Sequence, residues 1–159
     1  MPIRKLKKFL EDHHIKFRVI SHSTTYTALE VAELVHISGR EIAKTVMVKM
    51  DGKMAMVVLP ASYHVDFDRL EETAGMKHIE LANEDDFKDM FPDCEIGAMP
   101  PFGNLYGMEV FIEPKLAEDR EIAFNAGNHR ELIKMSFEDF DKLVNPKRLS
   151  FLCTLTGMK

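Results

Sequence analysis

The stretch "EIAKTVMVKMDGKMAMVVLP", Glu41–Pro60, decides the fold of this chain. Two apolar segments rich in valine and methionine lie on either side of Asp51–Gly52. An Asp-Gly pair between such segments is the strongest short-range signal for a β-hairpin with a two-residue turn. The sequence therefore predicts an antiparallel hairpin whose first strand lies inside a sheet.

Before this hairpin, the sequence predicts a helix, a strand and a second helix. Ile3, Leu6 and Leu10 mark one apolar face of an opening helix, and "IKFRVI" alternates like a half-buried strand. "TALE" at Thr27–Glu30 has the hydroxyl and the carboxylate of a capping box, so a second helix is expected from here to about Ile37.

After the hairpin, further helices and strands follow without strict βαβ alternation. Asp66 is expected to cap a helix that runs to Ala74, Asn83 to begin a helix that Pro92 ends, and Ser136 to cap a last helix. The segments "KHIEL", "MEVFIEP", "EIAFNAG" and "HRELIKM" are predicted strands. This order indicates an α+β fold with a mixed, mostly antiparallel sheet flanked by helices.

The length of 159 residues favours one domain over 1–159, with residues 147–159 as a C-terminal tail whose packing the sequence leaves open. The start of the chain has charges throughout and no apolar core of a signal peptide, and no apolar run has the length of a membrane span. Cys94 and Cys153 form no CxxC motif and fit a reducing compartment. We therefore expect a cytoplasmic protein without a membrane partner.

The net charge of −5 limits the nucleic acids that the chain is expected to bind. Proteins that grip a long duplex usually carry a basic domain or stripe. We expect no DNA partner, and contact with only a few phosphates if the partner is RNA.

Metal and covalent catalysis have little support. The seven histidines show no HxxxH or HExxH spacing, and neither a GxSxG elbow nor a local catalytic cysteine signature occurs. Walker A and GxGxxG motifs are absent as well. The sequence predicts no metal and no cofactor.

Three short segments remain as candidate sites. "CEIGAMPPFGNLYG", Cys94–Gly107, is a stiff Gly/Pro loop, which is either a structural crossover or a backbone surface that touches a ligand. Lys44 is expected to share a strand face with Val46 and Val48. Its ammonium group either reaches past the strand edge into solvent or is a cation placed to bind a phosphate or carboxylate. "NAGNHRE", 125–131, is an ordinary polar turn or a site at a strand end.

The order of these segments resembles a known family. "HSTTYTALEVA", "REIAKTVMVK", "VVLPASYHVDFDRL", "IGAMPPFG" and "FNAGNHRELI" together are similar to the YbaK/prolyl-tRNA-synthetase-associated-domain family, over roughly residues 10 to 145. Its members are trans-acting aminoacyl-tRNA deacylases and the editing domains inserted in bacterial prolyl-tRNA synthetases. The resemblance implies a barrel-like sheet.

The resemblance also implies roles for particular residues. The family's lysine falls on Lys44 and would hold the phosphate or terminal-adenosine region of the tRNA acceptor end. The GxxxP loop falls on Gly97–Pro101 and would position the scissile carbonyl or the attacking water. The histidine of the NAG-x-H turn falls on His129 and would contribute to selecting or positioning the substrate. Other residues implied to touch the substrate are Thr45, Ala98, Met99, Pro100, Pro101, Gly127 and Asn128. Pro100 stands where many relatives have serine, which removes a hydroxyl and an amide donor.

The implied function is hydrolysis of the ester of a mischarged tRNA, with tRNA-Pro as a candidate acceptor, that carries a small amino acid; the role is translation quality control. An aminoacyl ester is already activated, so fixed backbone donors that position water and carbonyl suit this reaction. The alternative is a non-catalytic module of the same fold that binds the tRNA end or an aminoacyl-tRNA synthetase.

Overall fold

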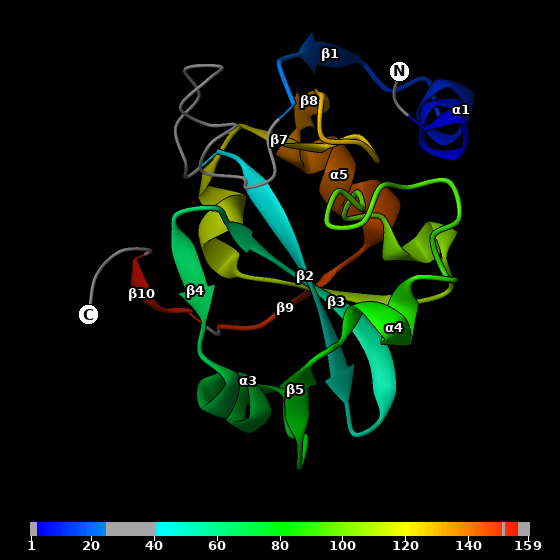
Figure 1. Cartoon of the computed structure of the whole chain (residues 1–159). Coiled ribbons are helices and arrows are strands. Elements are labelled where there is room, and N and C mark those ends of the chain that lie inside the picture. Colours follow the sequence, from blue (N-terminus) through cyan, green and yellow to red (C-terminus); the bar gives the residue numbers. More distant parts are fainter. Residues whose placement is uncertain (1–2, 25–40, 151, 156–159) are drawn as a thin grey trace.

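A computed structural model describes residues 3–24, 41–150 and 152–155 of the chain (Figure 1). The largest sheet has five strands in the order β5-β2-β3-β6-β9. These strands span Ile79–Leu81 (β5), Ala43–Met50 (β2), Lys53–Pro60 (β3), Glu109–Ile112 (β6) and Lys147–Arg148 (β9). The pairs β3–β6 and β6–β9 are parallel, whereas β2 is antiparallel to both of its neighbours.

The predicted hairpin is confirmed at the centre of this sheet. β2 and β3 pair along their whole length, from Ala43 opposite Pro60 to Met50 opposite Lys53. Asp51 and Gly52 form the two-residue turn with φ of 49° and 86°, the positive values that a type I′ turn requires.

A second sheet has the order β1-β8-β7, with β1 at Phe17–Ser21, β8 at Glu131–Ser136 and β7 at Glu121–Asn125. A third pairs β10 (Leu152–Leu155) with β4 (Tyr63–Val65). A parallel bridge between Ile42 and Ala123 connects the start of β2 to β7. The α+β class and the mostly antiparallel pairing are confirmed, and the strands are divided among three hydrogen-bonded sheets.

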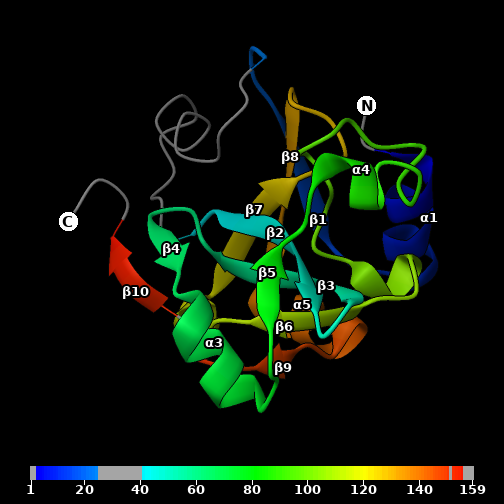
Figure 2. The same cartoon turned by 60° about the horizontal axis from the view of Figure 1, so that its bottom comes forward.

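Two hydrophobic clusters cover the two faces of the five-stranded sheet. Along β3, Met56 and Val58 face one cluster, and Val57 and Leu59 face the other, as the two-residue period of a strand requires. The larger cluster packs against α1 (Arg4–Asp12), α5 (Phe137–Val144) and the β7–β8 hairpin, and the smaller one packs against α3 (Phe67–Ala74). α1 and β1 lie at one end of the molecule and α3 at the other (Figures 1 and 2).

The helix ends follow the sequence signals where these are described. Asp66 accepts a hydrogen bond from the Arg69 N–H at the start of α3, and Ser136 accepts one from the Asp139 N–H at the start of α5. Asn83 forms a capping box for α4, but α4 covers only Glu84–Phe87 and then continues as turns. The helix expected at Thr27–Ile37 lies outside the described residues. Short 3₁₀ helices at Gly103–Leu105 (η1) and Pro114–Glu118 (η2) complete the elements.

The described residues of the C-terminal tail, 147–150 and 152–155, pack on the domain through backbone pairing. β9 extends the five-stranded sheet, and Leu149 N–H donates to the Ile112 carbonyl at 3.0 Å. The Thr73 hydroxyl donates to the Ser150 carbonyl at 3.2 Å, and β10 pairs with β4. None of the helices in the described ranges is both long enough and apolar enough to cross a bilayer.

Candidate functional site

The Gly/Pro loop has a short exposed part and a long buried part. Ile96 and Gly97 are exposed, whereas the segment from Ala98 to Gly103 is buried. Phe102, completely buried, packs against Phe124 of β7 and Phe140 of α5 with ring centroids 5.4 and 5.5 Å apart, respectively. The core therefore anchors the loop and presents the backbone of 96–97 at the surface.

Gly97 has a backbone conformation that favours glycine. Its φ is 85°, a region that L-residues rarely adopt. A Cβ at this position would lie 3.6 Å from His129 Cε1, which is ordinary contact, so the backbone angle and not crowding is what favours glycine here. Within the described residues, neither the Ile96 nor the Gly97 N–H donates a hydrogen bond.

The NAG-x-H turn follows β7 and is tightly packed. Gly127 has a φ of 96°, and a Cβ there would overlap Ile3 Cγ2. The Asn128 side chain accepts from the Arg130 N–H at 2.8 Å and donates to the Glu131 carboxylate at 3.2 Å. Asn128 and His129 are 5% and 6% exposed, so the turn is built into the domain and is not a solvated polar turn.

Hydrogen bonds join the loop to the turn. The Gly127 N–H donates to the Ala98 carbonyl at 3.0 Å, and the Glu95 N–H donates to the Gly127 carbonyl at 2.8 Å. His129 Nε2 lies 2.8 Å from the Ile96 carbonyl; because a carbonyl can only accept, Nε2 is the donor. The structure thus brings Gly97, Ala98, Gly127 and His129 together from segments 30 residues apart in the chain.

Glu95 is a residue of this junction that the sequence analysis did not single out. Its carboxylate accepts from the His129 N–H at 3.4 Å and lies 3.7 Å from the Arg130 guanidinium. It therefore holds the turn from the loop side. The only signal in the sequence is its position two residues before the loop glycine, and that position belongs to no motif by itself.

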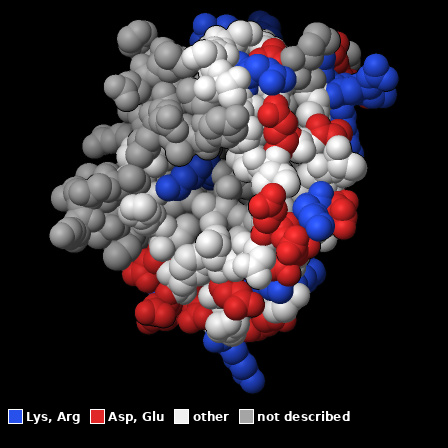
Figure 3. Space-filling view, viewed as in Figure 1, with Lys and Arg blue, Asp and Glu red and all other residues white. Residues whose placement is uncertain are grey.

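Lys44 lies on the strand face that period-2 alternation predicted. It is half-buried on β2 opposite Leu59, on the same face as Val46 and Val48. Burial lowers the pKa of its ammonium group from the usual lysine value. Inside the described ranges no side chain forms an ion pair or hydrogen bond with it. A basic side chain is visible in a hollow over the first part of β2 (Figure 3).

The bridge between β2 and β7 places Lys44 relative to the turn. Ala123 N–H donates to the Glu41 carbonyl at 2.9 Å, and Ile42 pairs with Ala123 in parallel. From this bridge β2 leads to Lys44 as β7 leads to Asn125 and the turn. Among the described residues, the Lys44 side chain forms no hydrogen bond with Gly97 or His129.

Of the remaining predicted residues, Thr45 lies on β2, and Met99, Pro100 and Pro101 lie in the buried part of the loop. Thr45 is half-buried on the face of β2 opposite to Lys44, across from Val58. Met99, 5% exposed, belongs to the larger hydrophobic cluster, and Pro100 and Pro101 are buried beside it. These three residues support the loop from the core side. In the described segments, no three His, Cys, Asp or Glu side chains are close enough to hold a metal ion.

A family profile, curated relatives and solved structures were compared with this chain, and all three include aminoacyl-tRNA editing proteins. The sequence profile of the aminoacyl-tRNA editing domain matches residues 22–143. The multifunctional Ser/Thr-tRNA deacylase ProXp-y of Escherichia coli (strain K12) is 26% identical over 153 residues, which cover 93% of this chain and 91% of that protein. A proline–tRNA ligase of Bacillus mycoides (strain KBAB4) is 24% identical over 88 residues, which are 55% of this chain and 15% of the ligase.

Solved structures share the fold. A crystal structure of a candidate trans-editing enzyme for prolyl tRNA synthetase superimposes with a TM-score of 0.81 at 18% identity, covering 96% of this chain and 97% of that one. A crystal structure of a hypothetical protein gives a TM-score of 0.83 at 19% identity, covering 94% of this chain and all of the other.

Proposed function

The chain belongs to the aminoacyl-tRNA editing domain family, and we propose that it hydrolyses the ester bond of mischarged aminoacyl-tRNAs in translation quality control. The observation that carries the proposal is the exposed Ile96–Gly97 backbone, whose two N–H groups have no partner among the described residues. Hydrogen bonds from the NAG-x-H turn hold this backbone in place. We place the reaction in the cytoplasm, where tRNAs are charged.

In the proposed reaction, water attacks the ester carbonyl while the loop binds the oxygen that becomes negative. A backbone N–H fixed before the reaction stabilises such an oxyanion without reorganisation, and one donor of this kind contributes about 10²- to 10³-fold in rate. The Gly97 N–H is the donor that we assign to this role. The bond between the ribose oxygen and the carbonyl carbon breaks, and the amino acid leaves as its carboxylate.

His129 is assigned to substrate selection and to the position of the loop. Its Nε2 hydrogen is donated to the Ile96 carbonyl, so this nitrogen is not available to take a proton from water. Because the Gly127 N–H still binds the Ala98 carbonyl in the His129→Ala variant, we expect this variant to change the preference among amino acids more than the maximal rate. Measurement of kcat and KM for several charged tRNAs checks this, and an equal loss on every substrate would contradict it.

Lys44 is assigned to the acceptor end of the tRNA. A half-buried ammonium group without a carboxylate partner in the described structure is available to a phosphate, which a lysine binds as a point charge. The amino-acid pocket is then assigned to Thr45, Ala98, Gly127 and Asn128, with Met99, Pro100 and Pro101 behind it. An apolar pocket excludes large side chains by contact but separates small ones by only about 1–3 kcal/mol per methylene.

The proposed substrates are consequently tRNAs that carry a small amino acid, such as alanine, cysteine or serine, with tRNA-Pro as one acceptor. The name of the E. coli relative adds threonine to this set. The same proposal includes an aminoacyl-tRNA synthetase as a further candidate partner.

The decisive experiment measures hydrolysis of labelled Ala-, Cys-, Ser- and Thr-tRNAs, including charged tRNA-Pro, by the wild type and by Lys44→Ala. Turnover of one or several species that is lost in the folded variant supports the enzyme. If the folded wild type binds tRNA but hydrolyses nothing in the panel, the chain is a non-catalytic binding module.

A further inference from the structure

The N-terminal segment is basic although the protein as a whole is acidic. Residues 1–21 hold six of the 21 Lys and Arg side chains but only two of the 26 Asp and Glu side chains, so the segment carries +4 and the rest of the chain −9. The six basic residues are Arg4, Lys5, Lys7, Lys8, Lys16 and Arg18, and all of them are exposed. Basic side chains are visible over α1 and along the β1 edge (Figure 3).

Intramolecular contacts do not account for most of these charges. Lys8 pairs with Asp12 at 2.9 Å, and the Lys5 ammonium lies 4.5 Å from the centre of the Tyr106 ring. The side chains of Arg4, Lys7, Lys16 and Arg18 make no ion pair or hydrogen bond with any residue that the structure describes. Four cations are therefore open to a partner.

The charges on α1 also oppose the stability of the helix. The first turn contains basic residues and no acidic one, whereas Glu11 and Asp12 stand in the last turn. The helix dipole favours the reverse arrangement, and Ile3 at the N-cap provides no side-chain cap. Arg4 and Lys7 are thus placed where they cost helix stability.

The same is true on β1. Arg18 lies directly opposite Lys134 of β8, so that two cations occupy a cross-strand pair. Like charges in this position are unfavourable. Glu121 lies 3.8 Å from Lys134, while Arg18 is left exposed.

The basic segment begins at the proposed site. The Ile3 N–H donates to the Ala126 carbonyl at 3.0 Å, and the Ile3 side chain fills the space that a Cβ of Gly127 would need. α1 starts at the next residue, so its first basic residues begin next to the NAG-x-H turn in space.

We propose that the exposed cations of α1 and β1 bind the phosphate backbone of the acceptor stem, beyond the terminal nucleotide that Lys44 holds. The proposal rests on the proposed function for the identity of the RNA. Phosphate contacts of this kind fix the orientation of a nucleic acid without reading its sequence. They would give an acidic protein a local grip on the RNA close to the site.

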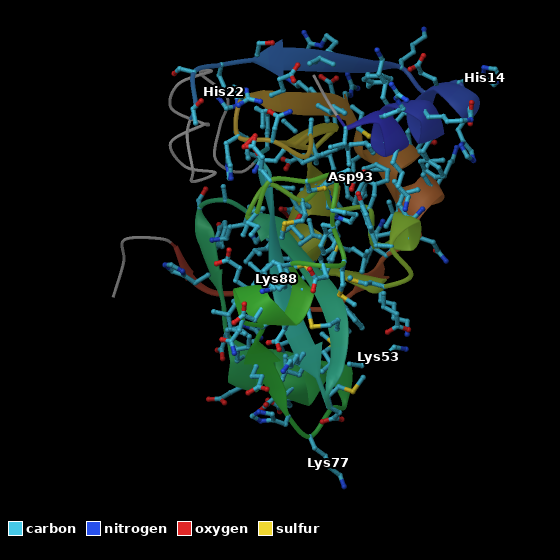
Figure 4. All side chains as sticks on the ribbon, turned by 45° about the vertical axis from the view of Figure 1, so that its right-hand side comes forward. His14, His22, Lys53, Lys77, Lys88 and Asp93 are labelled. Carbon is cyan, nitrogen blue, oxygen red and sulfur yellow. The ribbon has the colours of Figure 1, made fainter. Side chains whose placement is uncertain are left out.

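Two variants that each remove two charges test the proposal. Arg4→Gln/Lys7→Gln changes α1, and Lys53→Gln/Lys77→Gln changes two exposed lysines at the end of the molecule opposite to α1, where Figure 4 labels them. The dissociation constant of uncharged tRNA is measured for both variants and the wild type over a series of KCl concentrations. The α1 variant should weaken binding at least about threefold and lower the slope of log Kd against log [KCl] by about 1 to 2.

The control variant should leave both quantities unchanged, and the melting temperature of the α1 variant should not fall, since its lost charges opposed the helix dipole. Turnover of a short aminoacylated CCA trinucleotide should be the same in all three proteins, because that substrate has no acceptor stem. Unchanged tRNA binding in the α1 variant, or an equal loss in both variants, overturns the proposal.

The outcome is separable from that of the proposed function. If the wild type hydrolyses no charged tRNA but the α1 variant alone loses binding of uncharged tRNA, the basic surface stands and the deacylase proposal fails. If the wild type hydrolyses charged tRNA and the α1 variant binds tRNA like the wild type, the deacylase proposal stands and the proposal for the basic surface fails.

Discussion

Lys44 carries a positive charge on a strand face that is otherwise apolar. Replacing it by methionine keeps the length of the side chain and removes the charge. We expect Lys44→Met to lower kcat/KM about 10- to 100-fold, the loss of one charge-assisted hydrogen bond, while the melting temperature stays equal or rises, because a half-buried ammonium group is no longer desolvated. Lys53→Met, in the exposed turn region, should change neither value.

The lowered pKa of Lys44 also predicts a pH dependence. Burial lowers the folded-state pKa below the unfolded value, so the ammonium charge is lost at a lower pH than for an exposed lysine. Binding of uncharged tRNA should therefore weaken as pH rises towards the usual lysine value of about 10.4. The Lys44→Arg variant keeps its charge over this range, so its tRNA binding should depend less on pH. If the wild type and the variant have the same pH profile, Lys44 does not bind the RNA. The sign for stability is the opposite: the native state binds fewer protons between the two pKa values, so this group contributes more stability as pH rises through that window.

At the scale of single residues, the sequence predicted a position that follows from a local pattern: the alternation of β2 predicted which face Lys44 shares. The roles of Gly97 and His129 come from the family resemblance and are proposals. Glu95 and Ile3 could not be found in this way, because their roles come from contacts with a turn that is distant in the sequence. The same holds for Met99, whose burial depends on how the loop meets the core.

At the scale of elements, the close approach of α1 to the NAG-x-H turn can be tested with two glycines. Gly127 and Gly52 have similar positive φ values, 96° and 86°, but a Cβ at Gly127 meets Ile3, whereas a Cβ at Gly52 meets nothing within 4 Å. Both alanine variants have the backbone strain, and only Gly127→Ala has the overlap. We expect Gly127→Ala to cost at least about 1 kcal/mol more in the free energy of unfolding.

Urea unfolding of both variants measures the difference. Equal losses would show that Ile3 moves aside without cost. The packing argument would then fail, although the Ile3–Ala126 hydrogen bond would remain.

Elements that carry their own end signals were predictable, and elements that depend on tertiary pairing were not. The caps at Asp66 and Ser136 and the Asp-Gly turn are local chemistry, and all three are found. α4 ends earlier than expected because aspartate-rich segments are weak helix formers and Phe91 turns into the core ahead of Pro92. The three-residue β4 and the tail strands β9 and β10 have no strong pattern of their own and form only because partners are present.

At the scale of the whole molecule, the C-terminal residues complete the largest sheet and support its edge. β9 pairs with β6, Arg148 lies 3.2 Å from Asp141 of α5, and Lys147 lies 3.2 Å from Glu109. A chain that ends after Asn145 would leave β6 as an open edge next to the buried Phe111. An unpaired edge of this kind promotes association between molecules.

We therefore expect the chain that ends after Asn145 to lose about 2 kcal/mol or more of unfolding free energy, since it loses backbone pairs worth about 1 kcal/mol each, and to associate at high concentration. A chain that ends after Leu155 keeps β9 and β10 and is the control in urea unfolding. If the shorter chain is as stable and as monomeric as the control, the tail contributes no free energy to the fold. Hydrolysis by the two chains then shows whether the site depends on this edge: the hydrogen bonds described between the loop and the turn join residues 95–98 to residues 127–129, so a truncated protein that remains folded should keep its rate.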